Sequence, residues 1–258
     1  MTPVAATALV TSSEATSSPS AARDDSPHCR RHELTNMRLQ RAAVGTAAVI
    51  RALVDFGGGE DEEPGATALA AQAGVSQILH HLHDLELVDR SGHGRWESRR
   101  EALLDRFLAE YPGPGGSEQY YYSLSSPVDV AIRAGRVSTP DHPIVASADV
   151  GPDLILPWRR PSLVILYAKR VIDPTGLGLT PAQGSHDANV IMRNPEDRSV
   201  FPVPALTAQV QGSDVPLADP LQQIWDLQEL GGADRIEAAG RLRQWLLERG
   251  CTEGLYPV

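Results

Sequence analysis

The chain has 258 residues, of which 41% are hydrophobic, enough to bury a core and to form two domains. A formal net charge of −10 excludes a protein that coats nucleic acid without specificity, although a local basic patch can still bind it. Two distant cysteines argue against disulfides, and no signal peptide is recognisable. No apolar run approaches the ~20 residues that span a bilayer. The sequence therefore predicts a cytoplasmic protein with no membrane partner.

Residues 1–35 are rich in Ser, Thr, Ala and Pro and show no periodicity. Such a composition cannot bury enough apolar surface to offset chain entropy, so we expect a disordered tail. Three potential metal ligands lie in it, His28, Cys29 and His32. Without a second cluster they do not predict a metal site.

Residues 36–111 are expected to form a DNA-binding domain. Its first helix is predicted over residues 39–56, where Ala43, Ala47, Ile50 and Val54 recur at helical spacing. Glycines at 57–59 then end this helix, and the acidic residues 60–63 form a loop.

The stretch 66–98 predicts two short helices, a tight turn and a two-stranded wing. Gly74 is expected to end the first helix, because glycine enters the left-handed region without a Cβ penalty. Ser76 is expected to cap the second helix, which then has about one turn fewer than usual for a recognition helix. A hairpin with a Gly-rich tip follows. This order is typical of a winged helix-turn-helix, whose second helix enters the major groove of DNA.

The candidate DNA contacts are the polar face of that second helix and the basic residues around the wing. They are Ser76, Gln77, His80, His81, Arg90, His93, Arg95, Arg99 and Arg100. Glutamine can pair with adenine and histidine can donate to guanine, whereas arginines beside the wing would neutralise phosphates. Two other interpretations stay open: a small subdomain that packs against another part of the protein, and a metal held by the histidines, which is the weaker of the two.

Residues 117–258 are expected to form a mixed α/β domain, with the boundary at the Pro/Gly run 112–116. Before it, residues 100–111 form an amphipathic helix. The predicted elements after it are a strand over 120–124, a helix over 127–134, a helix within 142–158, a strand over 162–167, a long loop over 172–187, and a hairpin of 188–192 with 199–201.

Two helices joined by Gly231 and Gly232 are expected to end the chain as an antiparallel hairpin. Asp219 caps the first of them, with proline at the first helical position. Asp234 would cap the second, in a capping box with Glu237. Its buried stripe is expected to be Ile236, Ala239, Leu242 and Leu246. The fold class is therefore α+β: a winged helix-turn-helix, then a mixed α/β domain that ends in a helical hairpin.

No catalytic set emerges from the sequence. Ser185, His186 and Asp187 are consecutive, and a triad needs side chains that meet from separate elements. Gly184-Ser185 with Asp187 faintly resembles a nucleotidyltransferase loop, but the next strand lacks the paired carboxylates that hold metal ions. Residues 175–179 have neither the third glycine nor the lysine of a phosphate loop. We therefore expect no enzyme, no cofactor and no metal.

Three later segments carry a resemblance to a known family. They are residues 189–201, residues 218–227 and residues 237–243. With the helix-turn-helix stretch, their order and spacing resemble the AbiEi family of antitoxins, from bacterial abortive-infection or toxin–antitoxin loci.

The resemblance implies a winged domain that binds repeats in its own promoter and represses it. It also implies a C-terminal domain that counteracts a nucleotidyltransferase-like toxin without a stable complex. A regulatory or interaction protein without specific DNA binding is the alternative, and a degenerate nucleotidyltransferase comes third. A homodimer is left open.

Overall fold

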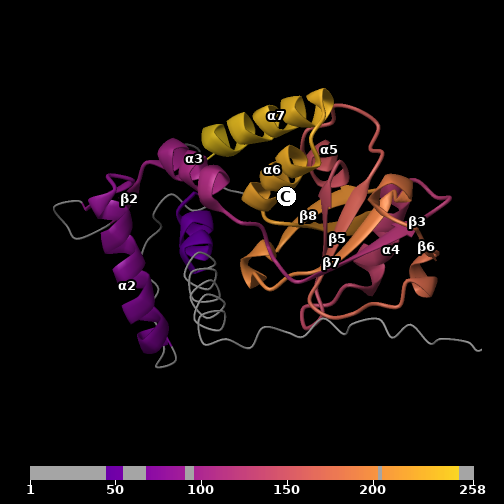
Figure 1. Ribbon diagram of the computed structural model, residues 1–258, viewed down its shortest axis with the longest axis horizontal. Helices are drawn as coiled ribbons and strands as arrows, with labels where there is room; N and C mark the ends of the chain where they lie inside the picture. Colours follow the sequence, from indigo (N-terminus) through magenta and orange to yellow (C-terminus); the bar gives the residue numbers. More distant parts are fainter. Residues whose placement is uncertain (1–44, 55–67, 91–95, 203–204, 250–258) are drawn as a thin grey trace, which may run out of the picture. The chain divides into compact units, whose positions relative to one another are not determined.

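The computed structural model describes residues 45–54, 68–90, 96–202 and 205–249 (Figure 1). Residues Gln40–Val258 cluster into one compact unit. The predicted tail 1–35 with its three metal-ligand candidates, the acidic loop 60–63 and the candidate contacts His93 and Arg95 lie outside the described residues. The predicted boundary at 112–116 falls inside the compact unit.

The fold is mixed α+β and is built on a seven-stranded sheet. In sequence its strands are β3 (Ser117–Tyr122), β4 (Ile144–Ala148), β5 (Val164–Ala168), β6 (Thr180–Pro181), β7 (Val190–Asn194), β8 (Leu206–Val210) and β9 (Ser213–Leu217). Their order across the sheet is β6-β3-β7-β5-β4-β9-β8. The pairs β5–β7 and β4–β9 are parallel, and the other pairs are antiparallel.

The central strands β4 and β5 are buried along their whole length. Since successive side chains of a strand point to opposite faces, both faces of the sheet are covered at these strands. One face packs on α4 (Pro127–Val137) and α5 (Val150–Ile155), through residues such as Val164 and Leu166. The other face carries Ile165 and Tyr167, and there Tyr167 contacts α6 (Pro220–Leu230).

The preceding part of the unit is helical with one small hairpin. It consists of helical residues 45–54, α2 (Ala68–Asp84), β1 (Val88–Arg90) paired antiparallel with β2 (Trp96–Ser98), and α3 (Arg100–Glu110). Its apolar side chains share one core with α6 and with α7 (Ala233–Arg249). Helices α6 and α7 therefore connect α3 to the sheet (Figure 1).

Several predicted elements are confirmed. Ala47, Ile50 and Val54 are buried along residues 45–54. The hairpin of β1 and β2 forms as expected. The predicted cap at Asp219 is present, because its carboxylate accepts from the amides of residues 221 and 222.

The predicted break at Gly74 is wrong, because α2 is one helix of 17 residues that runs through it. Ser76 lies inside the helix rather than at its cap, and its carbonyl contacts His80 Nδ1 at 2.7 Å. A glycine inside a helix costs only about 1 kcal/mol relative to alanine, so it does not by itself end one. The helix is correspondingly longer than the short recognition helix that we expected.

Two further predictions fail in the sheet, and one hairpin of the sheet was not predicted. A helix was expected within residues 142–158. The first part of this segment is instead the fully buried strand β4, and only the short helix α5 follows it. The expected hairpin of 188–192 with 199–201 does not form, because β7 lies between β3 and β5 and residues 198–200 are a 3₁₀ turn. The hairpin of β8 and β9 was missed; Gln211 and Gly212, both with positive φ, form its turn.

Two details of α7 also differ from the prediction. The helix begins at Ala233, so Asp234 lies in its first turn instead of capping it, and the Ile236 amide donates to the Gly232 carbonyl. Ile236 is 52% exposed, whereas Ala239, Leu242 and Leu246 are buried as expected. Among the described helices, none is long and apolar enough to cross a membrane.

Candidate functional site

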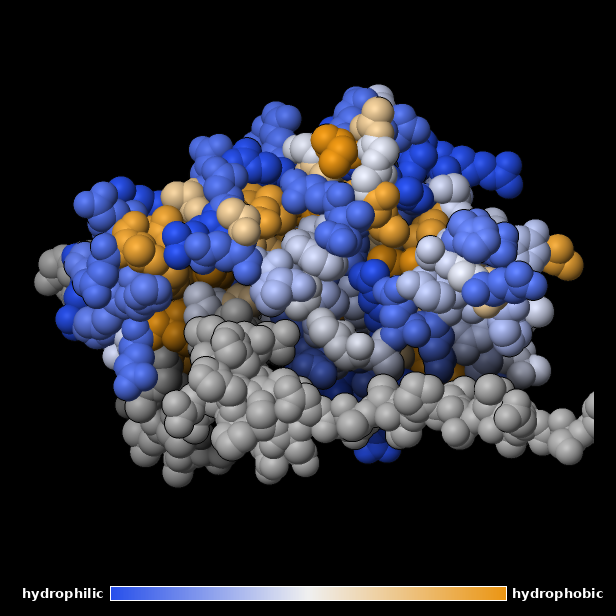
Figure 2. Space-filling view, viewed as in Figure 1, coloured by the Kyte–Doolittle hydropathy of each residue, from blue (hydrophilic) through white to orange (hydrophobic). Residues whose placement is uncertain are grey.

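The exposed face of α2 holds the candidate base-reading residues. Ser76, Gln77 and His80 are exposed there, and Leu82 is buried on the opposite side. His81 is also exposed but lies beside Leu82 at the edge of a pocket. The space-filling view shows apolar surface beside the hydrophilic surface of α2 (Figure 2). The helix is therefore anchored on one side and presents a polar face on the other.

Trp96 attaches the hairpin to α2. Its ring lies edge-on to His80 at 5.3 Å and to His83 at 5.9 Å, and the guanidinium of Arg90 lies 5.6 Å from it. His83 Nδ1 also contacts the carbonyl of Val88 at 2.9 Å. Aromatic and cation–π contacts of this kind fix orientation as well as adding stability, so α2 and the wing form one surface.

The candidate arginines divide between surface and interior. Arg90 and Arg99 are exposed, and Arg99 Nε donates to Asp89 at 3.0 Å. Arg100 instead donates to three main-chain carbonyls, of Val54, Leu246 and Leu247. Its guanidinium thus joins residues 45–54 to the last turn of α7 inside the unit, where a cation near helix carbonyls is favourable.

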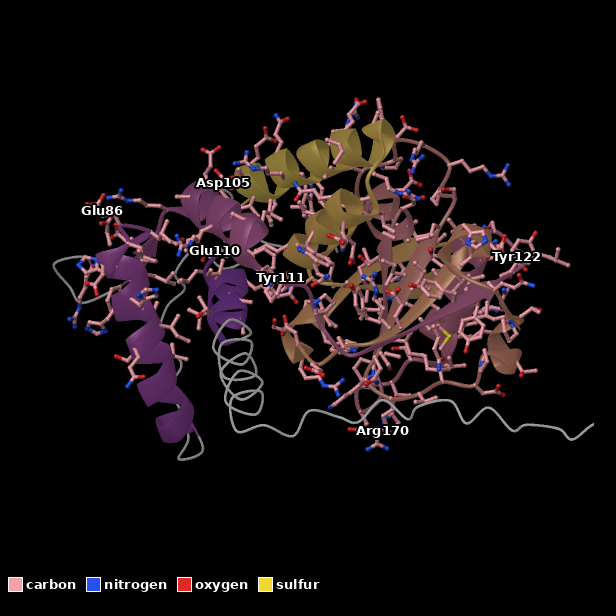
Figure 3. All side chains as sticks on the ribbon, viewed as in Figure 1. Glu86, Asp105, Glu110, Tyr111, Tyr122 and Arg170 are labelled. Atoms are coloured by element: carbon pink, nitrogen blue, oxygen red, sulfur yellow. The ribbon has the colours of Figure 1, made fainter. Side chains whose placement is uncertain are left out.

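Acidic side chains surround the same surface. Asp84, Glu86, Asp89 and Glu97 are exposed on or beside α2 and the hairpin, and Figure 3 labels Glu86 at this end. The described part of the surface is therefore of mixed charge. Binding to a polyanion here depends on a few local contacts and not on a broad positive field.

The polar residues of the 218–227 segment are buried. Arg51, itself 3% exposed, forms an ion pair with Asp219 and donates to Gln222 Oε1 at 2.8 Å. It also lies 3.6 Å from Asp197, which accepts from the Tyr111 hydroxyl at 2.6 Å. Burial lowers the pKa of Arg51, but the facing charges, Asp219 first, outweigh it and leave that pKa raised. Arg51 stays charged.

The same network continues to Asp226, which is fully buried. Its carboxylate accepts from Ser147 at 2.5 Å, Tyr167 at 2.7 Å and Arg193 at 3.1 Å. Burial raises the pKa of Asp226 and outweighs these favourable contacts. Because these groups satisfy one another away from solvent, their role is structural: they hold α6 on the sheet.

One sequence signal of this network is the position of Arg51. Arg51 lies four residues after Ala47 and three before Val54, so a charged side chain falls on the buried stripe of a helix. A charge in that position needs a partner from elsewhere in the chain. The sequence gives no means of naming Asp219 as that partner.

The other chemical candidate from the sequence is the run Ser185–Asp187. Ser185–Asp187 form an exposed 3₁₀ turn, where His186 Nε2 lies 3.2 Å from Asp187. Within the described residues, no group of three His, Cys, Asp or Glu side chains is placed to hold a metal ion.

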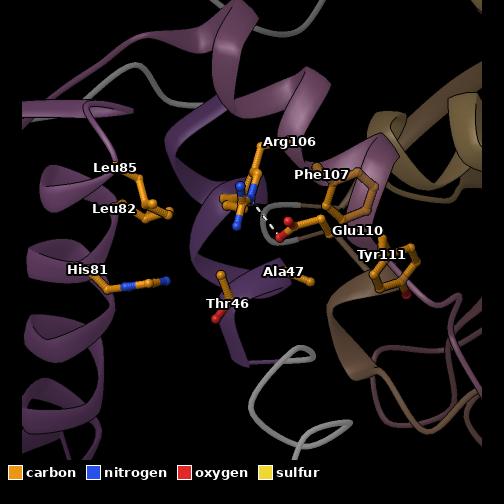
Figure 4. A pocket seen from close by; sticks show the side chains of 10 residues that line it. Thr46, Ala47, His81, Leu82, Leu85, Arg106, Phe107, Glu110 and Tyr111 are labelled. Atoms are coloured by element: carbon orange, nitrogen blue, oxygen red, sulfur yellow. Dashed lines mark ion pairs between the residues drawn. The ribbon is translucent and has the colours of Figure 1, made fainter.

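A pocket of about 140 Å³ lies between residues 45–54, α2 and α3 (Figure 4). Its apolar wall is Ala47, Ile50, Leu82, Leu85 and Phe107. Its polar side chains are Thr46, His81, Arg106, Glu110 and Tyr111. The sequence did not predict this pocket, because it depends on how three separate helices pack.

Comparison with protein-family models, with curated proteins and with solved structures finds no match to this chain.

Proposed function

We propose that this protein is a DNA-binding transcriptional regulator of the AbiEi antitoxin type, in which α2 and the β1–β2 hairpin act as recognition helix and wing. The observation that carries the proposal is the exposed polar face of α2 beside a hairpin that Trp96 fixes to it. In this proposal residues 45–54 and α3 support the recognition helix, because their apolar side chains share a core with Leu82 of α2.

In this proposal Gln77 faces base edges and Arg90 contacts a phosphate, whereas His81, a candidate from the sequence, points toward the pocket between α2 and residues 45–54. A base contact carries sequence information and a phosphate contact does not. Arg99 is already paired with Asp89 of the hairpin, and Arg100 joins residues 45–54 to α7, so neither is assigned a DNA contact here.

Gel-shift titrations of the full chain on its own upstream region, at two salt concentrations, test the DNA-binding part. Gln77→Ala is expected to cost about 1–3 kcal/mol on the operator and little on random DNA. Arg90→Gln is expected to weaken binding to every sequence and to lower the salt slope by about one. Arg170→Gln is the matched control, because Arg170 is an exposed arginine after β5. If both test variants bind like Arg170→Gln, α2 and the wing are not the DNA reader.

That outcome would favour the second candidate, a regulatory or interaction protein without specific DNA binding. The acidic side chains around the wing are the observation in its favour, since they oppose a polyanion.

The antitoxin part of the proposal rests on the resemblance of residues 189–201, 218–227 and 237–243. Co-expression of the full chain with a nucleotidyltransferase-like toxin from a neighbouring gene is expected to restore growth, without a stable complex in gel filtration. Persistent toxicity at full expression of both proteins contradicts this part alone.

We further propose that the chain has no transfer activity of its own, because Asp226 and its partners are occupied inside the fold. Incubation with nucleoside triphosphates, Mg²⁺ and RNA is expected to give no labelled product. Transfer that disappears in Asp187→Asn or Asp173→Asn would overturn this.

A further inference from the structure

We propose that the pocket between residues 45–54, α2 and α3 binds a small aromatic carboxylate with a single ring. Its volume is about 140 Å³. An apolar cavity of about 150 Å³ is known to hold one benzene molecule, so one ring is the size that fits.

The wall of the pocket suits the face and edge of a ring. Ile50, Leu82 and Phe107 are each at most 3% exposed, so this surface is preformed and apolar. Phe107 is itself held by stacking on Tyr111, with ring centroids 4.5 Å apart. A ligand ring therefore meets a rigid aromatic partner and needs no rearrangement of the core.

The polar side chains of the pocket favour an anion. Arg106 Nε lies 2.6 Å from Glu110, and both side chains are at least 39% exposed, which makes the pair a weak one. A guanidinium has five N–H donors in a fork that matches a carboxylate, so its Nη groups can hold a ligand while Nε keeps Glu110. Figure 4 shows the His81 ring pointing toward the same space, where it adds a further donor.

A cationic ligand fits less well. Of the described residues that line the pocket, Glu110 is the one acidic side chain, and it is in contact with Arg106, whereas Arg106 and His81 both offer N–H donors to a ligand. An amine in the pocket would therefore face a guanidinium without an unpaired carboxylate to hold it.

The ligand would contact α2 through His81 and Leu82, and the neighbouring residue His80 packs on the wing. An effect of the ligand on operator binding rests on the proposed function. Binding of the ligand to the pocket does not rest on the proposed function.

Titration of the full chain with benzoate, followed by NMR, tests the site without DNA. Saturable binding is expected with a Kd on the order of 1 mM, as suits so small a ligand. Arg106→Gln is expected to weaken it about tenfold or more, because it removes the charge-assisted contact. Leu85→Trp, at the partly exposed rim, is expected to abolish it by filling the pocket.

Two controls make the result specific. Arg170→Gln removes the same charge outside the pocket and is expected to bind benzoate like the parent. Benzamide has the same ring without the charge and is expected to bind about tenfold more weakly. Circular dichroism verifies that each variant is folded.

A titration that does not saturate, equal affinity of Arg106→Gln and Arg170→Gln, or equal affinity for benzamide and benzoate overturns the proposal. A gel shift with benzoate is read separately. If the chain binds benzoate but no operator, the proposed function fails while the site stands.

Discussion

Arg51 and Asp219 form a buried ion pair although 168 residues separate them in sequence. The pair joins residues 45–54 to the N-cap of α6, and Gln222 and Asp197 complete its surroundings. Since Asp219 also accepts two amides of the first turn of α6, one carboxylate caps a helix and neutralises a distant arginine. The helical part and the sheet are thereby tied together at one point.

Removal of the Arg51 charge is expected to destabilise the compact unit that holds both the helical part and the sheet. Arg51→Met leaves Asp219 and Asp197 buried without their cation, which costs about 3–5 kcal/mol. Urea unfolding measures the free energy directly. The matched control is Arg99→Gln, whose pair with Asp89 is half exposed and is expected to contribute little. Equal destabilisation by the two variants contradicts the structural role of Arg51.

Arg100 is expected to matter for stability more than for DNA. Arg100→Gln loses donors to the carbonyls of Val54, Leu246 and Leu247, so the loss of stability is expected to be about 2 kcal/mol. Thermal unfolding measures this loss, and a gel shift below the melting temperature is expected to show unchanged affinity. Loss of affinity at full stability would make Arg100 a DNA contact instead.

Substitution of two glycines by alanine is expected to change the stability of the protein in opposite directions. Gly240 lies inside α7 with nothing within 4 Å of an added Cβ, so Gly240→Ala is expected to stabilise the protein by about 0.5–1 kcal/mol. Gly116 has a φ of +88° and an added Cβ would strike the carbonyl of Asn194, so Gly116→Ala is expected to cost more than about 1 kcal/mol. Chemical denaturation of both variants compares them; the same sign for both would contradict this prediction.

Acid stability is expected to depend on Asp149. This buried carboxylate accepts from Arg235 at 2.8 Å, Arg159 at 3.0 Å and Ser162 at 2.8 Å. Burial alone would raise the pKa of Asp149, but these hydrogen bonds and charges outweigh it and lower that pKa below the ordinary value of 3.8.

A carboxylate with a lowered pKa in the folded state stabilises that state above the unfolded pKa and ceases to do so as pH falls through the folded one. Asp149→Asn is therefore expected to lose stability at neutral pH and to show a weaker decline on acidification to about pH 3 than the parent protein. Urea midpoints across this range measure the difference. An unchanged acid slope in the variant would show that Asp149 contributes nothing to it.

Several elements can be predicted from the sequence because local interactions specify them. The helix at 45–54, α3 and α6 follow from apolar spacing, and the cap at Asp219 follows from a side chain two or three residues from the amides that it accepts. These features depend on neighbours in the chain, so a pattern of residues is enough to predict them.

Other features of the fold depend on tertiary packing and could not be predicted from the sequence. Whether Gly74 ends a helix, and whether residues 144–148 are helix or strand, depends on the segments that pack against them. The partner of Arg51 and the pocket between three helices likewise join residues that are distant in sequence. Hydrophobic periodicity indicates which side of a segment is buried. It does not identify the segment that packs on that side, because this depends on the free energy of the whole packed core.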